Sequence, residues 1–283
     1  MCALINFEGK AIFSEWVFFV TAALVGLLIG SFLNVVIYRG PAMWGLVGED
    51  KRARGDLIAP RSYCPSCKAP IARAHLAPLI GYLMVRGQCA SCGAKIPIRY
   101  LLVELLGAGA ALCECLLLGC TMPALFAAIF FWCLIALAVI DFETGYLPDA
   151  IVLPLIAAGL IANIGDRFVF FIDAAIGAAA GYLVFALVRL AYAAARGREG
   201  LGQGDAKLLA AIGAWVGWQG LPAVIFIAAA GSLAVILGIR LGGRRFQVGT
   251  ALPFGPGLCF GGAAVLAGSR IDLTLFADAF IGG

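Results

Sequence analysis

Residues 123–141 read PALFAAIFFWCLIALAVID, an apolar run that carries no charged side chain before Asp141. A helix of about 20 apolar residues crosses a hydrocarbon core roughly 30 Å thick, so this run is long enough to span a membrane. Similar runs predict further helices at 15–38, 99–119, 149–164, 168–190, 205–218, 220–240 and 250–268. The run at 205–218 is short and is interrupted by Gly213 and Gly217, which favours a partial or tilted span. The sequence therefore predicts an all-α polytopic membrane protein with about eight transmembrane helices.

The composition supports one membrane domain with one inserted soluble loop. Hydrophobic residues make up 63% of the chain and charged residues 13%, whereas soluble domains are about half apolar and about a quarter charged. We expect a first transmembrane helix within 1–38, a polar loop domain at 39–98 and a helical membrane domain at 99–283. The first apolar run is too long for a secretory signal and should remain as a spanning helix. Membrane lipid is the expected surrounding, and the modest net charge of +4 predicts no nucleic-acid partner.

The Lys and Arg residues favour one orientation in the membrane. If the 39–98 loop is cytoplasmic, seventeen of the twenty lie on the cytoplasmic side, and the other three are Lys10, Arg167 and Arg270. Cytoplasmic loops near membrane ends carry an excess of Lys and Arg, so both termini are expected to face away from the cytoplasm. In this topology Asp141 ends the third helix and Asp205 begins the sixth, and both lie at the cytoplasmic boundary.

The polar loop contains a candidate metal site. Cys64-Pro-Ser-Cys67 and Cys89-Ala-Ser-Cys92 are two Cys-x-x-Cys turns separated by 21 residues. This spacing is typical of zinc ribbons, in which four thiolates surround one ion and leave no position for water. The sequence therefore predicts a structural zinc site. Disulfides are the alternative interpretation, but they seldom persist in the reducing cytosol, where the charge pattern places this loop.

The other candidate metal ligands lack such a pattern. We expect His75, the only histidine, to be a surface residue of the loop and not a fifth ligand. The remaining six cysteines lie in or beside apolar runs without paired spacing, and we expect them to behave as small hydrophobic residues. They are Cys2, Cys113, Cys115, Cys120, Cys133 and Cys259.

Acidic residues at the edges of membrane helices are costly and are therefore candidates for function. Asp149, at the start of the fourth helix, and Asp205 both fit helix N-caps, which would give each a purely structural role. Capping does not explain Asp141 at a helix C-terminus, where the helix dipole disfavours negative charge. Something else must stabilise that carboxylate.

A pair of carboxylates offers such an explanation. Two carboxylates close together at low dielectric share a proton, and this arrangement activates water for attack on a peptide carbonyl. We therefore interpret Asp141 and Asp205 as a catalytic pair, with the neighbouring Gly202, Gly204, Lys207 and Asp149 in supporting roles. No histidine is placed for a Ser-His-Asp set and the zinc site is closed, so no other hydrolytic centre competes.

Six motifs then make the chain recognisable by their order. They are GSFLNVVIYR at 30–39, the two Cys-x-x-Cys turns, RYLLVE at 99–104, Asp141 with Leu147-Pro148-Asp149, GQGDAK at 202–207 and PFGP at 253–256. In this order and at these intervals the chain resembles the bacterial type IV prepilin leader peptidases over nearly its whole length. The GQGD sequence also resembles that of presenilin-like proteases, but those lack the cysteine loop.

The resemblance implies a bifunctional aspartic endopeptidase of the bacterial inner membrane. Such an enzyme cleaves the basic leader of type IV prepilins and type II secretion pseudopilins at the cytoplasmic face, then methylates the new N-terminus with S-adenosylmethionine. The family's catalytic aspartates match Asp141 and Asp205, and Gly87 matches a glycine associated with methyl transfer. The 39–98 loop would be the methyltransferase part. There the chain reads Arg73-Ala-His-Leu-Ala-Pro78, where relatives usually carry an aromatic-acidic-Asn stretch.

The sequence is also compatible with two other classes of protein, a secondary transporter and an inactive assembly scaffold. Membrane aspartates also serve proton relays in secondary transporters, although no inverted repeat is visible in this sequence. An inactive assembly scaffold built around the zinc loop would need both aspartates to be helix caps.

Overall fold

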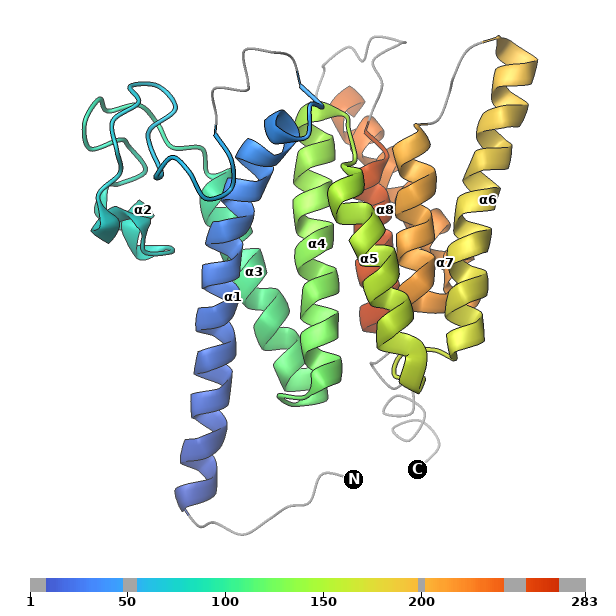
Figure 1. Cartoon of the computed structure of the whole chain (residues 1–283), viewed down its shortest axis with the longest axis horizontal. Helices are drawn as coiled ribbons and strands as arrows, with labels where there is room; N and C mark the ends of the chain where they lie inside the picture. The colour runs from blue at the N-terminus through green and yellow to red at the C-terminus, as the bar shows by residue number, and fades with distance from the viewer. Residues whose placement is uncertain (1–8, 48–54, 198–201, 242–252, 270–283) are drawn as a thin grey trace. The chain divides into compact units, whose positions relative to one another are not determined.

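The computed structural model describes residues 9–47, 55–197, 202–241 and 253–269 (Figure 1). Within these ranges the regular structure is helical, apart from two isolated β-bridges in the polar loop. The helices are α1 (Gly9–Met43), η2 (Arg73–Leu76), α2 (Ile80–Met84), α3 (Arg99–Leu118), α4 (Met122–Thr144), α5 (Asp149–Ala162), η3 (Asn163–Gly165), α6 (Phe171–Arg196), α7 (Gln203–Leu241) and α8 (Gly255–Gly268). The prediction of an all-α protein is confirmed.

Five of these helices are long and apolar enough to cross a membrane, namely α1, α3, α4, α6 and α7. The helices α5 and α8 are shorter and apolar. The backbone of α7 is non-helical at Gly217, where φ is 73° and ψ is 173°. Glycine adopts a positive φ without a steric penalty, so the chain bends there. This bend divides the two segments predicted at 205–218 and 220–240.

Several helix boundaries differ from their predicted positions. The prediction that Asp141 ends the third helix is corrected, because α4 continues to Thr144 and Asp141 lies inside its last turn. Residues 250–252 of the predicted last helix lie outside the described ranges. So do Cys2, Arg270 and six of the seventeen Lys and Arg residues counted on the cytoplasmic side, namely Lys51, Arg52, Arg54, Arg198, Arg244 and Arg245.

The chain divides into two compact units, and the first comprises Met1–Val36 with Asp56–Trp132. In this unit α1 and α3 touch backbone to backbone. A Cβ atom added at Gly26 would lie 2.5 Å from the carbonyl oxygen of Gly107, and one at Gly30 would lie 2.7 Å from the Cα of Glu104. The indole Nε1 of Trp132 donates to the same Gly107 carbonyl at 2.9 Å. Small residues thus allow close helix packing without large interlocking side chains.

The second unit comprises Ile37–Gly55 with Cys133–Gly283 and contains α5 to α8. Here α7 is the helix against which the others pack. A Cβ atom at Gly181 of α6 would lie 2.6 Å from the carbonyl oxygen of Leu209, and one at Gly261 of α8 would lie 2.6 Å from that of Val224. The α5 helix is joined to α7 by Trp215, whose Nε1 donates to the Leu155 carbonyl at 2.9 Å. These contacts hold α7 against α5, α6 and α8.

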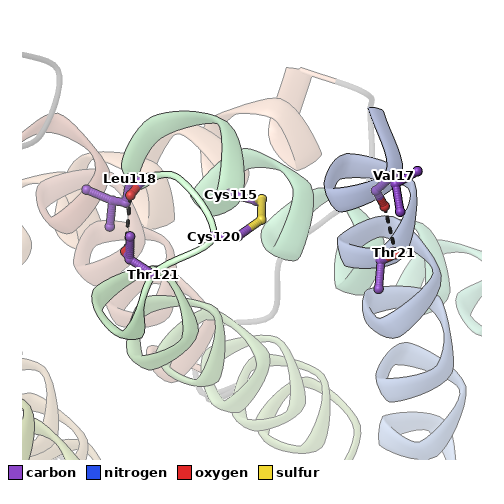
Figure 2. Close-up of a disulfide and its surroundings, with 6 residues drawn as sticks. All are labelled: Val17, Thr21, Cys115, Leu118, Cys120 and Thr121. Carbon is purple, nitrogen blue, oxygen red and sulfur yellow. Dashed lines mark hydrogen bonds between the residues drawn. A yellow bond between two sulfur atoms is a disulfide. The ribbon is translucent and has the colours of Figure 1, made fainter. Parts of the chain in front are cut away.

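A disulfide joins Cys115 to Cys120 where α3 ends and the turn to α4 begins (Figure 2). The prediction that both behave as small hydrophobic residues is therefore wrong. The two cysteines are five residues apart, a spacing that by itself does not indicate a disulfide. Their sulfurs meet because α3 ends at Leu118 and the chain turns there. Cys113, Cys133 and Cys259 keep their thiols.

Candidate active site and metal centre

The two Cys-x-x-Cys turns are built by the same backbone pattern. The amide of Cys64 donates to the Ala69 carbonyl at 2.9 Å, and that of Cys89 donates to the Ala94 carbonyl at 2.8 Å. In each turn the residue four positions after the first cysteine donates back to that cysteine's carbonyl. That residue has a positive φ in both turns, 59° at Lys68 and 70° at Gly93. Each turn therefore presents two sulfurs on one side.

The four sulfurs of the loop form one cluster, with all four within 4.8 Å of one another. The sulfurs of Cys64 and Cys92 are 3.9 Å apart, and those of Cys67 and Cys89 are 4.0 Å apart. Four zinc–sulfur bonds of about 2.3 Å in a tetrahedron place the sulfurs about 3.8 Å apart. The residues therefore fit a tetrahedral ion, and the separations exclude disulfides among them. His75 is not part of the cluster.

The first cysteine of each turn favours the thiolate, which is the form that binds metal. Backbone N–H groups, that of Cys67 first, lower the pKa of the Cys64 thiol to about 6. The backbone N–H of Ser91 lowers the pKa of Cys89 in the same way. Since the thiolate is the metal ligand, these backbone groups prepare the first sulfur of each turn for a cation. The pKa of Cys92 is instead raised, by its side-chain hydrogen bond with Cys67 and by desolvation.

Asp141 is 5% exposed and lies against the start of α8. The backbone N–H of Gly255 donates to its Oδ2 at 3.1 Å. A Cβ atom at position 255 would lie 2.5 Å from the same oxygen. The approach of α8 to this carboxylate therefore requires glycine.

Asp205 lies in the first turn of α7, close to Asp141. The backbone N–H of Gly202 hydrogen-bonds its carboxylate, which also interacts electrostatically with that of Asp141. The structure thus brings together two carboxylates that lie far apart in sequence. The buried thiol of Cys259 on α8 interacts electrostatically with both carboxylates. The sequence alone did not indicate Cys259 as a residue of this site, because Cys259 lies in an apolar run.

Neither of the two aspartates interpreted as possible helix caps occupies an N-cap position. The α5 helix has Pro148 at its N-cap position, with no side-chain cap hydrogen bond. The Asp149 carboxylate instead forms an ion pair with Lys207, with its two oxygens 2.8 and 2.7 Å from Nζ. The α7 helix begins at Gln203, so Asp205 lies within the helix and does not precede it.

Gly204 also makes the close approach expected of a glycine at this position. A Cβ atom there would lie 3.0 Å from the Cβ of Leu147. The start of α7 therefore contacts Leu147, in the segment between α4 and α5, through Gly204, and contacts the first residue of α5 through the ion pair of Lys207 with Asp149. Both points lie next to an aspartate of the pair.

Gly87 closes the turn that leads into the second cysteine pair. Its φ is 69°, and a Cβ atom would lie 2.8 Å from the hydroxyl of Tyr82. Its carbonyl accepts the amide of Ile96 at 2.8 Å. The loop is also attached to α3, because the Glu104 carboxylate accepts the Leu79 amide at 2.8 Å.

Comparison with known proteins covers the same regions. The profile of the Bacterial Peptidase A24 N-terminal domain matches residues 24–117, and that of the Type IV leader peptidase family matches residues 128–239. The prepilin leader peptidase/N-methyltransferase of Pseudomonas aeruginosa is 41% identical over 271 residues, which cover 91% of this chain and 93% of that protein. The chain belongs to the type IV leader peptidase family.

Other members of the family are equally similar. The proteins of the same name from Aeromonas hydrophila and Burkholderia pseudomallei are 40% and 41% identical over 270 and 260 residues. These alignments cover 90% and 87% of this chain, and 93% and 84% of the relatives. No solved structure matches the chain. The first matched profile contains the four cysteines, and the second contains Asp141 and Asp205.

The Lys207–Asp149 pair generates a test of its own. Its side chains are 25% and 52% exposed, so we expect solvent screening to limit the coupling between them to about 0.5–1 kcal/mol. A double-mutant cycle with Lys207→Ala and Asp149→Ala, read by thermal unfolding in detergent, measures this coupling. The exchanged pair Lys207→Asp with Asp149→Lys should recover part of the loss. Strictly additive single effects would show that the two side chains do not stabilise each other.

Proposed function

We propose that this protein cleaves the leader from prepilin and pseudopilin precursors with Asp141 and Asp205, and then methylates the new N-terminus. Family membership and the names of the relatives support both activities. The observation that carries the assignment of the aspartates is their convergence. One carboxylate from α4 and one from α7 interact electrostatically in a unit whose buried side chains are mostly apolar.

In the proposed reaction the two carboxylates share one proton. The ionised carboxylate takes a proton from water, whose oxygen attacks the peptide carbonyl carbon, while the protonated partner donates to the carbonyl oxygen. The carbon–nitrogen bond then breaks and the leaving amine takes a proton from the pair. Backbone N–H groups hold the carboxylates in place, that of Gly255 on Asp141 and that of Gly202 on Asp205.

Gly204, Lys207 and Asp149 support this pair by position. Gly204 leaves room for the side chain of Leu147. The ion pair joins Asp149, the first residue of α5, to Lys207 near the start of α7. Asp141 and Asp205 both lie within one turn of a helix end. A proton relay of a transporter is instead expected near the bilayer midplane.

We place the pair at the cytoplasmic face of the bacterial inner membrane, in a chain with eight membrane segments. The charge pattern supports this orientation, because seventeen Lys and Arg residues fall on that side and three on the other. The bend at Gly217 supports the number of eight membrane segments, since it divides α7 into two of them. A substrate with a basic leader would be oriented by the same rule, with its leader in the cytosol.

The loop domain at 39–98 binds one structural zinc ion in this proposal. Cys64, Cys67, Cys89 and Cys92 supply four ligands and complete the tetrahedron, so the ion organises the loop and performs no chemistry. The membrane domain at 99–283 carries both aspartates. Cleavage and methylation should therefore be separable.

S-adenosylmethionine is the proposed methyl donor. The name N-methyltransferase, shared by the relatives, supports a donor of this kind. Gly87 would act through its backbone, because it has no side chain and its turn requires a positive φ. The residues Arg73–Leu76, where this chain departs from its relatives' pattern, form the short helix η2.

The aspartate assignment is tested by replacing each member. Asp141→Asn and Asp205→Asn should each reduce cleavage of a prepilin peptide by roughly 10³-fold or more, and the double variant should lose little further activity, because the pair acts as a unit. Mass spectrometry of the products measures the rate. Zinc content and membrane insertion should persist.

Asp149→Asn is the matched control for these variants. It removes an acidic side chain at the same end of the bundle, and its cost should be limited to a partly exposed ion pair worth about 0.5–1 kcal/mol. Near-normal cleavage by either Asp141→Asn or Asp205→Asn would exclude the two-aspartate mechanism.

The zinc assignment predicts one zinc ion per chain. Cys67→Ser should lower zinc content and make the loop more sensitive to limited proteolysis, because metal binding contributes to folding. Cys113→Ser, outside the cluster, should change neither. Elemental analysis of the purified protein that found no stoichiometric zinc would contradict the assignment.

The separation of the two activities is tested at Gly87. Gly87→Val forces a β-branched residue into a positive φ against Tyr82, a conformation that costs about 1–3 kcal/mol. We expect methyl transfer to be lost while cleavage continues, as read from product masses with S-adenosylmethionine present. Gly93→Val places the same strain at an open position of the loop. It should spare methyl transfer if zinc remains bound, and a Gly87→Val protein that methylates normally would argue against the assignment.

A further inference from the structure

The two ends of α3 carry cysteines in opposite redox states. Before its first residue, Arg99, the loop holds four thiols in one cluster. In its last turn, Cys115 is joined to Cys120 by a disulfide. Thiols that bind metal must stay reduced, whereas disulfides form and persist in oxidising compartments. One helix therefore connects two kinds of cysteine chemistry.

The length of α3 is enough to separate these two environments. It contains 20 apolar-rich residues and qualifies as a membrane span. At 1.5 Å per residue such a helix is about 30 Å long, which is the thickness of the hydrocarbon core. The cysteine cluster and the disulfide therefore lie on opposite sides of the membrane.

The turn after α3 is built to hold the disulfide (Figure 2). Gly119, with φ at 67°, ends the helix, and Thr121 caps the turn by donating its hydroxyl to the Leu118 carbonyl at 3.1 Å. Cys115 is 4% exposed whereas Cys120 is exposed, so the bond joins the packed helix to its surface turn. The two Cα atoms are 4.9 Å apart, a separation that disulfides commonly span.

The charge pattern independently places this turn on the far side. The turn at residues 119–121, after the last residue of α3, contains no Lys or Arg, whereas ten occur from Arg39 to Arg99, on the other side of this helix. Turns that face away from the cytoplasm are poor in Lys and Arg. The redox states of the cysteines and the distribution of positive charge thus agree on the direction of α3.

We propose that Cys115 and Cys120 are an oxidative modification site on the extracytoplasmic face, where a thiol–disulfide oxidant converts them to the disulfide. The two thiols lose two protons and two electrons, one sulfur–sulfur bond forms, and the disulfide of the oxidant is reduced to a dithiol. The bond covalently ties the end of α3 to its turn into α4. This inference shares the orientation given under the proposed function but does not depend on the catalytic role of either aspartate.

The test labels cysteines from outside the cell. Spheroplasts that express the full chain in a Cys2→Ser background are treated with a membrane-impermeant maleimide, with or without a membrane-impermeant reductant. Peptide mass spectrometry then assigns each label. The Cys2→Ser background is needed because the N-terminus is expected on the same side. We expect Cys120, the exposed member of the pair, to be labelled only after reduction, and Cys67 and Cys92 only after permeabilisation with a chelator present.

Two controls make the outcomes distinguishable. Cys120→Ser should expose a maleimide-reactive Cys115 without reductant once the protein is denatured, whereas Cys113→Ser, on the same helix, should leave the pair unchanged. Labelling of Cys120 from outside without reductant would overturn the disulfide and leave the orientation standing. Labelling of Cys120 only after permeabilisation would overturn the extracytoplasmic site. Neither result would bear on cleavage by Asp141 and Asp205, which the aspartate variants test separately.

Discussion

The second unit depends on how a buried carboxylate is compensated at the end of an apolar helix. Asp141 is nearly inaccessible, and an unpaired polar group in such a place is costly. The backbone N–H of Gly255 supplies the hydrogen bond, which requires α8 to begin at that residue and to carry no side chain there. For α8 to reach this position it must pack closely on α7, and Gly261 permits this against Val224.

The same requirement explains how the second carboxylate is placed. The start of α7 lies against Leu147 through Gly204 and is joined to α5 by the Lys207–Asp149 ion pair. These contacts come from the segment that directly follows Asp141 in the chain. The short connection between α4 and α5 therefore holds Asp141 and Asp205 in one place, and the glycines around them serve close approach more than flexibility.

The polar loop differs from the membrane helices, because most of its hydrogen bonds join residues that are close in sequence. Each Cys-x-x-Cys turn is closed by its own backbone hydrogen bonds, with a positive φ at Lys68 in one and Gly93 in the other. Only the meeting of the two turns involves distant residues. A metal ion provides the strongest reason for that meeting, since four thiolates brought together without a cation would repel one another. Glu104 then attaches the loop to α3 through the Leu79 amide.

The amino-acid sequence by itself determined the features that depend on composition and local spacing. Apolar length predicted the helices, the repeated Cys-x-x-Cys turns predicted the sulfur cluster, and the motif order predicted the family. Tertiary structure decided what depends on contacts between distant segments. Asp149 and Asp205 each look like helix caps in sequence, because the residue type suits a cap, yet one pairs with Lys207 and the other interacts electrostatically with Asp141. Cys115, Cys120 and Cys259 carried no local pattern, and their partners became defined only when the helices had ends and neighbours. Gly255 lies in the PFGP motif, but its hydrogen bond to Asp141 appears only in the tertiary structure. The physical reason is that spacing along the chain determines only which nearby residues can contact each other. Contacts between distant residues are determined by the close packing of helices at glycine.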